Sequence, residues 1–162
     1  MSRKDTIRAT LHSNNTASLA SLKSLTAEQW QMPVPSESDA PWTAKDVLSH
    51  LAISEGGHVG QITRAVAGEE PVPADFDLTR YNRRSVQKNA EKSVEDLLKD
   101  LETNFSQLVA KLDAITAADL DKQGRHARGD VLAVADFFLR CAEHRLDHAQ
   151  QLQKAVSTRS EQ

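Results

Sequence analysis

The helical spacing of the apolar residues constrains the fold of this chain more than any other feature. Between residues 93 and 115 apolar side chains recur at every third or fourth position, as on one face of an amphipathic α-helix. These residues are Val94, Leu97, Leu98, Leu101, Phe105, Leu108, Leu112 and Ile115. Similar stripes occur in residues 4–25, 43–67 and 130–155, and no segment alternates as a strand would. The sequence therefore predicts an all-α fold, a four-helix bundle.

Residues typical of helix ends support these boundaries. Thr43, followed three positions later by Asp46, resembles a capping box, and Gly68 is suited to ending the same helix. Ser93 and Asp130 are favourable N-caps for the third and fourth helices. We therefore expect these helices to begin directly after their capping residues.

The connections between the predicted helices differ in character. Residues 26–42 cannot form a continuous helix because they contain three prolines, Pro33, Pro35 and Pro41. Trp30 and Trp42 bracket this connection and are expected to cover one end of the core. Residues 68–92 are expected to contain a short helix from Asp77 to Ala90, and residues 116–129 are expected to form a loop.

The composition indicates one domain and excludes several classes of protein. With 162 residues and 39% hydrophobic content, the chain suits a single domain over residues 1–162, with a core of about 4–155 and a frayed tail at 156–162. The net charge of −3 shows no basic excess for nucleic acid, and no apolar run or charge block points to a membrane. Polar residues follow Met1, so no signal peptide is expected. Because Cys141 is the only cysteine, a reducing compartment is expected, and we place the protein in the cytoplasm.

Two histidines in the fourth predicted helix indicate a metal site. His144 and His148 are four residues apart, so both imidazoles lie on one face of the helix, one turn apart. Both fall on its buried side, where a neutral imidazole needs partners for both nitrogens, and a metal ion is favoured over satisfied core histidines. Phe137 and Cys141 lie on the same face of this helix and are further candidates for lining the pocket. Cys141 is more typical of a small buried hydrophobic residue than of a fourth ligand.

His50 can join this site only if the second and fourth helices are antiparallel. His50 lies seven residues inside the start of one helix, and His148 lies seven residues inside the end of the other. At about 1.5 Å per residue they are level in an antiparallel pair, whereas a parallel pair separates them by roughly 16 Å. The sequence therefore predicts an up-down-down-up bundle, and the connection of about 25 residues between helices two and three can span the crossover.

These features together resemble the DinB/YfiT-like family of four-helix metalloenzymes, whose superfamily includes mycothiol-dependent maleylpyruvate isomerase and bacillithiol transferases. The resemblance rests on Trp42-Thr43 to His50-Leu51, on Asn82 in the crossover, and on His144-x-x-x-His148, and it covers essentially the whole chain. It implies an up-down-down-up bundle that binds a divalent metal, often zinc or nickel. By this resemblance the ligands are His50, His144 and His148, and His144 stands where relatives have a carboxylate.

Small and polar residues near His50 predict a cavity beside the metal. Ser54, Gly57 and Gln61 follow His50 along the flank of the apolar face and leave room for a ligand. Tyr81 and Asn82 either orient a substrate or simply begin a short helix, and these two interpretations stay open.

For two further histidines, His58 and His126, a structural role is favoured over a role in the site. His126, in the loop before the fourth helix, could reach the cavity mouth, but a surface position is favoured. His58 is interpreted as core packing, because Glu55-x-x-His58 is only half of a di-iron carboxylate motif and the second half is missing.

Two functions follow from these observations. The first is a metal-dependent enzyme of thiol-dependent transferase, isomerase or hydrolase type, acting on a small molecule with a low-molecular-weight thiol as possible co-substrate. The second is a non-catalytic bundle whose metal site is structural or vacant. A homodimer is expected in either case, because helices two and four carry apolar residues over more than half of their circumference.

Overall fold

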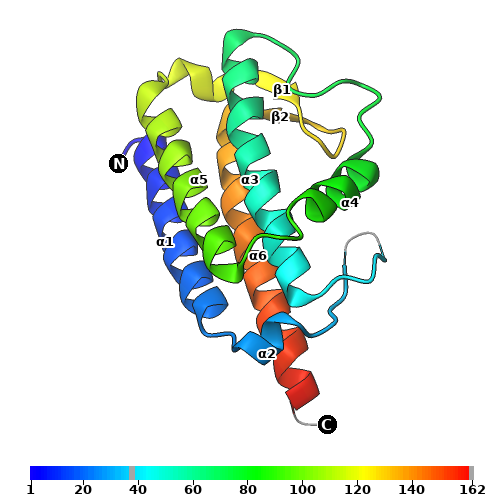
Figure 1. Cartoon of the computed structure of the whole chain (residues 1–162). Coiled ribbons are helices and arrows are strands. Elements are labelled where there is room, and N and C mark those ends of the chain that lie inside the picture. The colour runs from blue at the N-terminus through cyan, green and yellow to red at the C-terminus, as the bar shows by residue number, and fades with distance from the viewer. Residues whose placement is uncertain (37–38, 161–162) are drawn as a thin grey trace.

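Four long helices form the body of the molecule in the computed structural model, which describes residues 1–36 and 39–160 (Figure 1). They are α1 (Arg3–Lys23), α3 (Ala44–Ala67), α5 (Val94–Ala114) and α6 (Val134–Ser160). The predicted all-α class is confirmed. None of the described helices is long and apolar enough to span a membrane.

Two of the predicted N-caps form as expected. Thr43 and Asp46 make a reciprocal capping box at α3, and the Ser93 hydroxyl accepts a hydrogen bond from the backbone N–H of Asp96 at α5. Ser2 and Asp5 form the same box at α1. Gly68 ends α3 with φ of 77°, a left-handed conformation that glycine adopts without a steric penalty.

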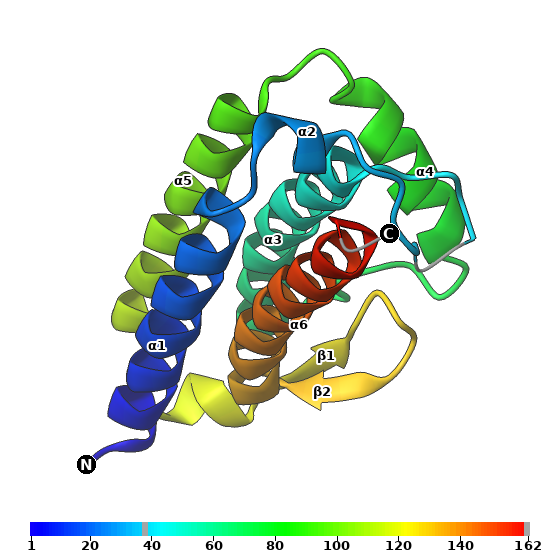
Figure 2. The same ribbon diagram turned by 90° about the horizontal axis from the view of Figure 1, so that it is seen from below.

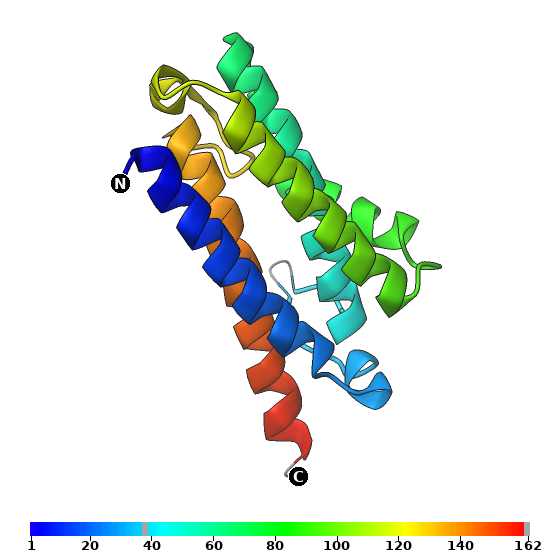
Figure 3. The same cartoon turned by 90° about the vertical axis from the view of Figure 1, so that its left-hand side faces the viewer.

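The direction of each helix follows from the colour gradient along the chain. α1 and α6 run one way, and α3 and α5 run the other way (Figures 1 and 3). α1 packs mainly against α6, α3 packs mainly against α5, and α3 also lies along α6. The last of these pairs is antiparallel, and it is the pair that carries the three predicted metal ligands.

The connections cover the ends and one flank of the bundle. The short helix α2 (Ala27–Trp30) and an isolated bridge between Pro33 and Thr43 close one end, where Trp30 and Trp42 are both buried. α4 (Leu78–Lys88) begins after its N-cap Asp77, as predicted, and packs against α3. Figure 2 shows α4 on the side of α3 and α6 that faces away from α1 and α5.

The segment before α6 differs from the prediction of a simple loop. After a 3-10 helix, η1 (Ala118–Asp121), the strands β1 (Gln123–Arg125) and β2 (Val131–Ala133) pair as an antiparallel hairpin, with Gly124 opposite Leu132. Strands of three residues are too short to show an alternating pattern in the sequence. The hairpin lies on the same flank as α4 (Figure 2).

The two ends of α6 also differ from the prediction. The helix begins at Val134 and not after Asp130, because residues 131–133 belong to β2. The side chain of Asp130 instead accepts two hydrogen bonds from the guanidinium of Arg140. At its other end α6 continues to Ser160, beyond the residue 156 at which the sequence predicted a frayed tail, and residues 161–162 lie outside the described part of the chain.

Candidate metal centre

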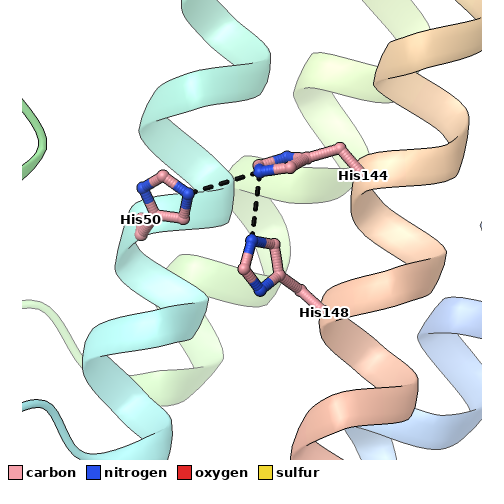
Figure 4. A group of neighbouring side chains, drawn as sticks. All are labelled: His50, His144 and His148. Atoms are coloured by element: carbon pink, nitrogen blue, oxygen red, sulfur yellow. Dashed lines mark hydrogen bonds between the residues drawn. The ribbon is translucent and has the colours of Figure 1, made fainter. Parts of the chain in front are cut away.

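The Nε2 atoms of three histidines converge between α3 and α6 (Figure 4). Nε2 of His144 lies 3.4 Å from Nε2 of His50 and 3.0 Å from Nε2 of His148. One ligand atom from each of the three residues lies within 4.8 Å of the others. The antiparallel packing of α3 and α6 thus brings His50 level with the histidines of α6.

These distances suit one divalent ion. An ion about 2.0–2.1 Å from two imidazole nitrogens, at an angle of about 90–110°, holds those nitrogens about 3.0–3.4 Å apart. The Nε2–Nε2 separations of 3.0 and 3.4 Å fall in that range. The group could therefore hold a metal ion, and imidazole is a suitable ligand for zinc, nickel, copper and iron.

The surroundings of the three rings restrict their movement. His50 and His148 are buried, His144 is half-buried, and the rings of His50 and His148 have centroids 5.3 Å apart. The indole of Trp42, directly before the N-cap of α3, lies 5.5 Å from the ring of His50. The predicted cover at this end of the core therefore also forms a wall of the candidate centre.

An open cavity of about 420 Å³ lies beside the centre. His50 and His144 line it together with six residues that the sequence analysis proposed for a pocket: Ser54, Gly57, Gln61, Tyr81, Asn82 and His126. α4 supplies Tyr81 and Asn82, and the hairpin loop supplies His126. The two elements outside the bundle therefore shape the space next to the histidines.

Two amide side chains in this cavity have hydrogen-bonding capacity to spare. Asn82 is buried, and its side chain makes no hydrogen bond among the described residues. The Oε1 atom of Gln61 is buried and has no hydrogen-bond partner there either. A buried polar group without a partner is costly, so such groups are rare and are candidates for binding a ligand.

Phe137 and Cys141, also proposed for the pocket, lie elsewhere. Phe137 is fully buried in the apolar core, and Cys141 lies in the core beside Glu55 and Arg145. Burial raises the pKa of the Cys141 thiol well above its usual value, so the group stays protonated. Cys141 therefore behaves as the small buried residue that the sequence analysis favoured.

His126 is not the surface residue that the sequence predicted. It is 4% exposed, and its Nε2 lies 3.1 Å from Nε2 of His58, which is also buried. Nδ1 of His126 accepts hydrogen bonds from the backbone N–H of Arg128 and from the guanidinium of Arg140, whereas Nδ1 of His58 donates to the carbonyl of Ser54. Since both rings are neutral, His126 donates its Nε2–H to His58.

This pair attaches the hairpin loop to α3. All four ring nitrogens have hydrogen-bond partners among the described residues, and because Nδ1 of His126 is an acceptor, its Nε2 carries the proton. Burial, together with the charge of Arg140, lowers the pKa of His126 to about 4. Burial and the nearby His126 lower the pKa of His58 to about 3. No sequence pattern indicated the contact, because its partners are 68 residues apart.

A buried ion pair lies next to the candidate centre and was also missed. Arg145 and Glu55 are 4% and 3% exposed, and the guanidinium binds both carboxylate oxygens. A signal was available in the sequence, because Arg145 directly follows His144 and lies outside the polar arc of α6, which carries Asp136, Arg140, Glu143 and Asp147.

Comparisons with known proteins agree with this fold. The model of the DinB superfamily matches residues 10–152. No curated protein matches the sequence. Among solved structures, the mycothiol-dependent maleylpyruvate isomerase and a histidine-to-alanine mutant of it each superpose with a TM-score of 0.77 at 12% identity.

The superposition covers 94% of this chain and 61% of each isomerase chain, so the protein spans less than two thirds of the length of those relatives. At this identity the likeness shows the shared helical fold alone. The family model covers most of the sequence, including all three converging histidines. The chain therefore belongs to the DinB superfamily.

Proposed function

We propose that His50, His144 and His148 hold one divalent metal ion, zinc or nickel, and that the protein is a metal-dependent enzyme. The observation that carries the proposal is the convergence of three Nε2 atoms beside a cavity of about 420 Å³. Three imidazole ligands leave coordination positions open, which is typical of catalytic sites and not of structural sites. When bound, the ion supplies Lewis acidity and lowers the pKa of a thiol or water.

The chain's own residues bind and orient the small molecule. The amide of Asn82 can donate to or accept from a substrate, and Gln61 offers its buried Oε1 as an acceptor. The hydroxyl of Tyr81, from the same helix as Asn82, adds a third polar group at the cavity wall. The His58–His126 hydrogen bond keeps the opposite wall in place. These contacts fix the substrate beside the three histidines.

A low-molecular-weight thiol is the co-substrate that we propose. The solved relative is named as a mycothiol-dependent isomerase, and its fold covers 94% of this chain. The activity proposed for this protein is therefore thiol-dependent transfer or isomerisation, or hydrolysis where water takes the place of the thiol.

The alternative, a non-catalytic dimeric bundle with a structural or vacant site, has weaker support. A structural site offers four protein ligands, whereas three converge here. The dimer was inferred from apolar residues on helices two and four, and many of these residues pack into the two core clusters of the chain. Among the described residues the exposed large apolar side chains are Met1, Tyr81 and Val131. The homodimer and the cytoplasmic location therefore stay predictions.

The test combines metal analysis with one substitution. Elemental analysis of untagged protein should find up to one zinc or nickel ion per chain. Cobalt-substituted protein should show a sulfur-to-metal charge-transfer band when a small thiol such as 2-mercaptoethanol is added, and the band should be absent from His144→Ala. A His144→Ala variant that stays folded and loses thiol-dependent turnover supports a catalytic site. Unfolding of the variant on loss of the metal supports a structural site.

A further inference from the structure

One buried guanidinium connects all four long helices of the bundle. Arg145 of α6 donates from Nε and Nη2 to the two carboxylate oxygens of Glu55 on α3, and from Nη1 to the side-chain oxygen of Asn15 on α1. Nη2 also donates to the carbonyl of Leu101 on α5 at 2.9 Å. The guanidinium carbon lies 5.9 Å from the ring centroid of Phe105 on α5. The side chain therefore has one fixed orientation.

Stability alone does not explain this arrangement. Moving two charges out of water is expensive, and a buried ion pair is often no more stabilising than well-packed apolar residues of similar volume. What the pair adds is geometry, because the planar guanidinium fork matches one placement of the carboxylate and fits poorly in others. An apolar contact between α3 and α6 would tolerate sliding far better.

The position of the pair links this geometry to the histidines. Arg145 directly follows His144, and Glu55 lies five residues after His50. A slip of one helical turn between α3 and α6 is about 5.4 Å. Such a slip exceeds the 3.4 Å that separates Nε2 of His50 on α3 from Nε2 of His144 on α6, so the three histidines converge at a single register only.

We infer that the Glu55–Arg145 ion pair is a positioning device that sets the register of α3 against α6 and so brings His50 to His144 and His148. The inference rests on the proposed function, in which these histidines hold one ion. Glu55 and Arg145 touch neither metal nor substrate in this scheme. They act through the backbones of the two helices that carry the ligands.

The test replaces the pair by apolar residues, Glu55→Leu with Arg145→Met. Dissociation constants for Zn2+ are measured by competition with a chelating dye, and folding by circular dichroism. The double variant should keep its helical content and bind zinc about tenfold to 100-fold more weakly, the effect typical of losing groups that orient metal ligands. Zinc affinity within threefold of wild type would overturn the inference.

A matched control removes an exposed interhelical pair that touches neither α3 nor α6. Arg8→Gln with Asp113→Asn deletes the ion pair between α1 and α5, at 2.5 Å, and should leave zinc affinity unchanged. If the apolar double variant fails to fold, Arg145→Lys retains the charge but loses the fork. This variant should also bind zinc at least tenfold more weakly, and wild-type affinity in it would contradict a register role.

A readout without metal separates this inference from the proposed function. In metal-free wild-type protein, nuclear Overhauser effects should connect the ring protons of His50 and His144, whose ring centroids are 5.2 Å apart. The apolar double variant should lose them. If wild-type protein shows these effects but binds no zinc, the proposed function fails and the register role stands. If the double variant keeps them, the register role fails whatever the zinc result.

Discussion

Substituting Arg145 alone by methionine should destabilise the fold severely. Both partners are almost fully buried, with side chains 5% and 3% exposed, so Arg145→Met leaves the carboxylate of Glu55 without its counter-charge in the core. Removing one member of such a pair typically costs about 3–5 kcal/mol. The whole free energy of unfolding of a domain is about 5–15 kcal/mol, so the loss is a large share of it. For a chain of this length the melting temperature should fall by roughly 6–20 °C.

The stability lost in Arg145→Met should also depend on pH, and the loss should grow as the pH rises. Burial raises the pKa of Glu55, and the hydrogen bonds from Arg145 oppose that shift, so Arg145→Met should raise the pKa further. A carboxyl group whose pKa is raised by folding contributes stability below its unfolded pKa and loses it as the pH rises through its folded pKa. The variant should therefore be less impaired at pH 5 than at pH 8.

Urea unfolding followed by circular dichroism at both pH values measures these effects. Adding Glu55→Leu to Arg145→Met should restore most of the lost stability and abolish the difference between the two pH values, because no buried charge remains. If Arg145→Met lowers the free energy of unfolding by less than about 1 kcal/mol at pH 8, the pair contributes no more than an exposed ion pair does, and the reasoning is refuted.

Further predictions concern other parts of the fold. Gly124→Ala should destabilise the protein by about 1–3 kcal/mol, since an added Cβ would lie 2.5 Å from a proline ring atom. Gly60→Ala, with no atom within 4 Å, should stabilise α3 by up to about 1 kcal/mol, and urea unfolding compares the two. The thiol of Cys141, buried and with a raised pKa, should react with a disulfide reagent only after unfolding, and rapid labelling of native protein would contradict its position. Because folding lowers the pKa of His126 to about 4 and of His58 to about 3, the free energy of unfolding should fall as the pH drops below about 6.5. His126→Gln should reduce that slope in acid titrations, and an unchanged slope would argue against a neutral buried pair.

The elements that could be predicted from the sequence are those whose signals are local. Thr43, Asp46 and Gly68 marked the ends of α3 because capping involves residues within one turn. The positions of His50 and His148 along their helix axes could be compared because the rise per residue of a helix does not depend on the rest of the fold. The ring centroids of His50 and His148 lie 5.3 Å apart, which agrees with that calculation.

What was missed depends on contacts between distant segments. His126 was assigned to a surface loop, yet the hairpin folds back so that His126 contacts His58 of α3. Arg145 was missed because a charged residue is expected in water unless its partners are known, and those partners come from three other helices. Partners brought together only by tertiary packing leave no periodic signal in a single sequence.

Titration of metal-free protein with Zn2+ by isothermal calorimetry tests the central claim most directly. We expect one site per chain in the wild type and none in a variant carrying His50→Ala, His144→Ala and His148→Ala. Asn82→Ala, which changes the cavity but none of the converging nitrogens, should bind zinc as the wild type does. Saturable binding of one ion by the triple variant, with wild-type affinity, would contradict the assignment of these three histidines.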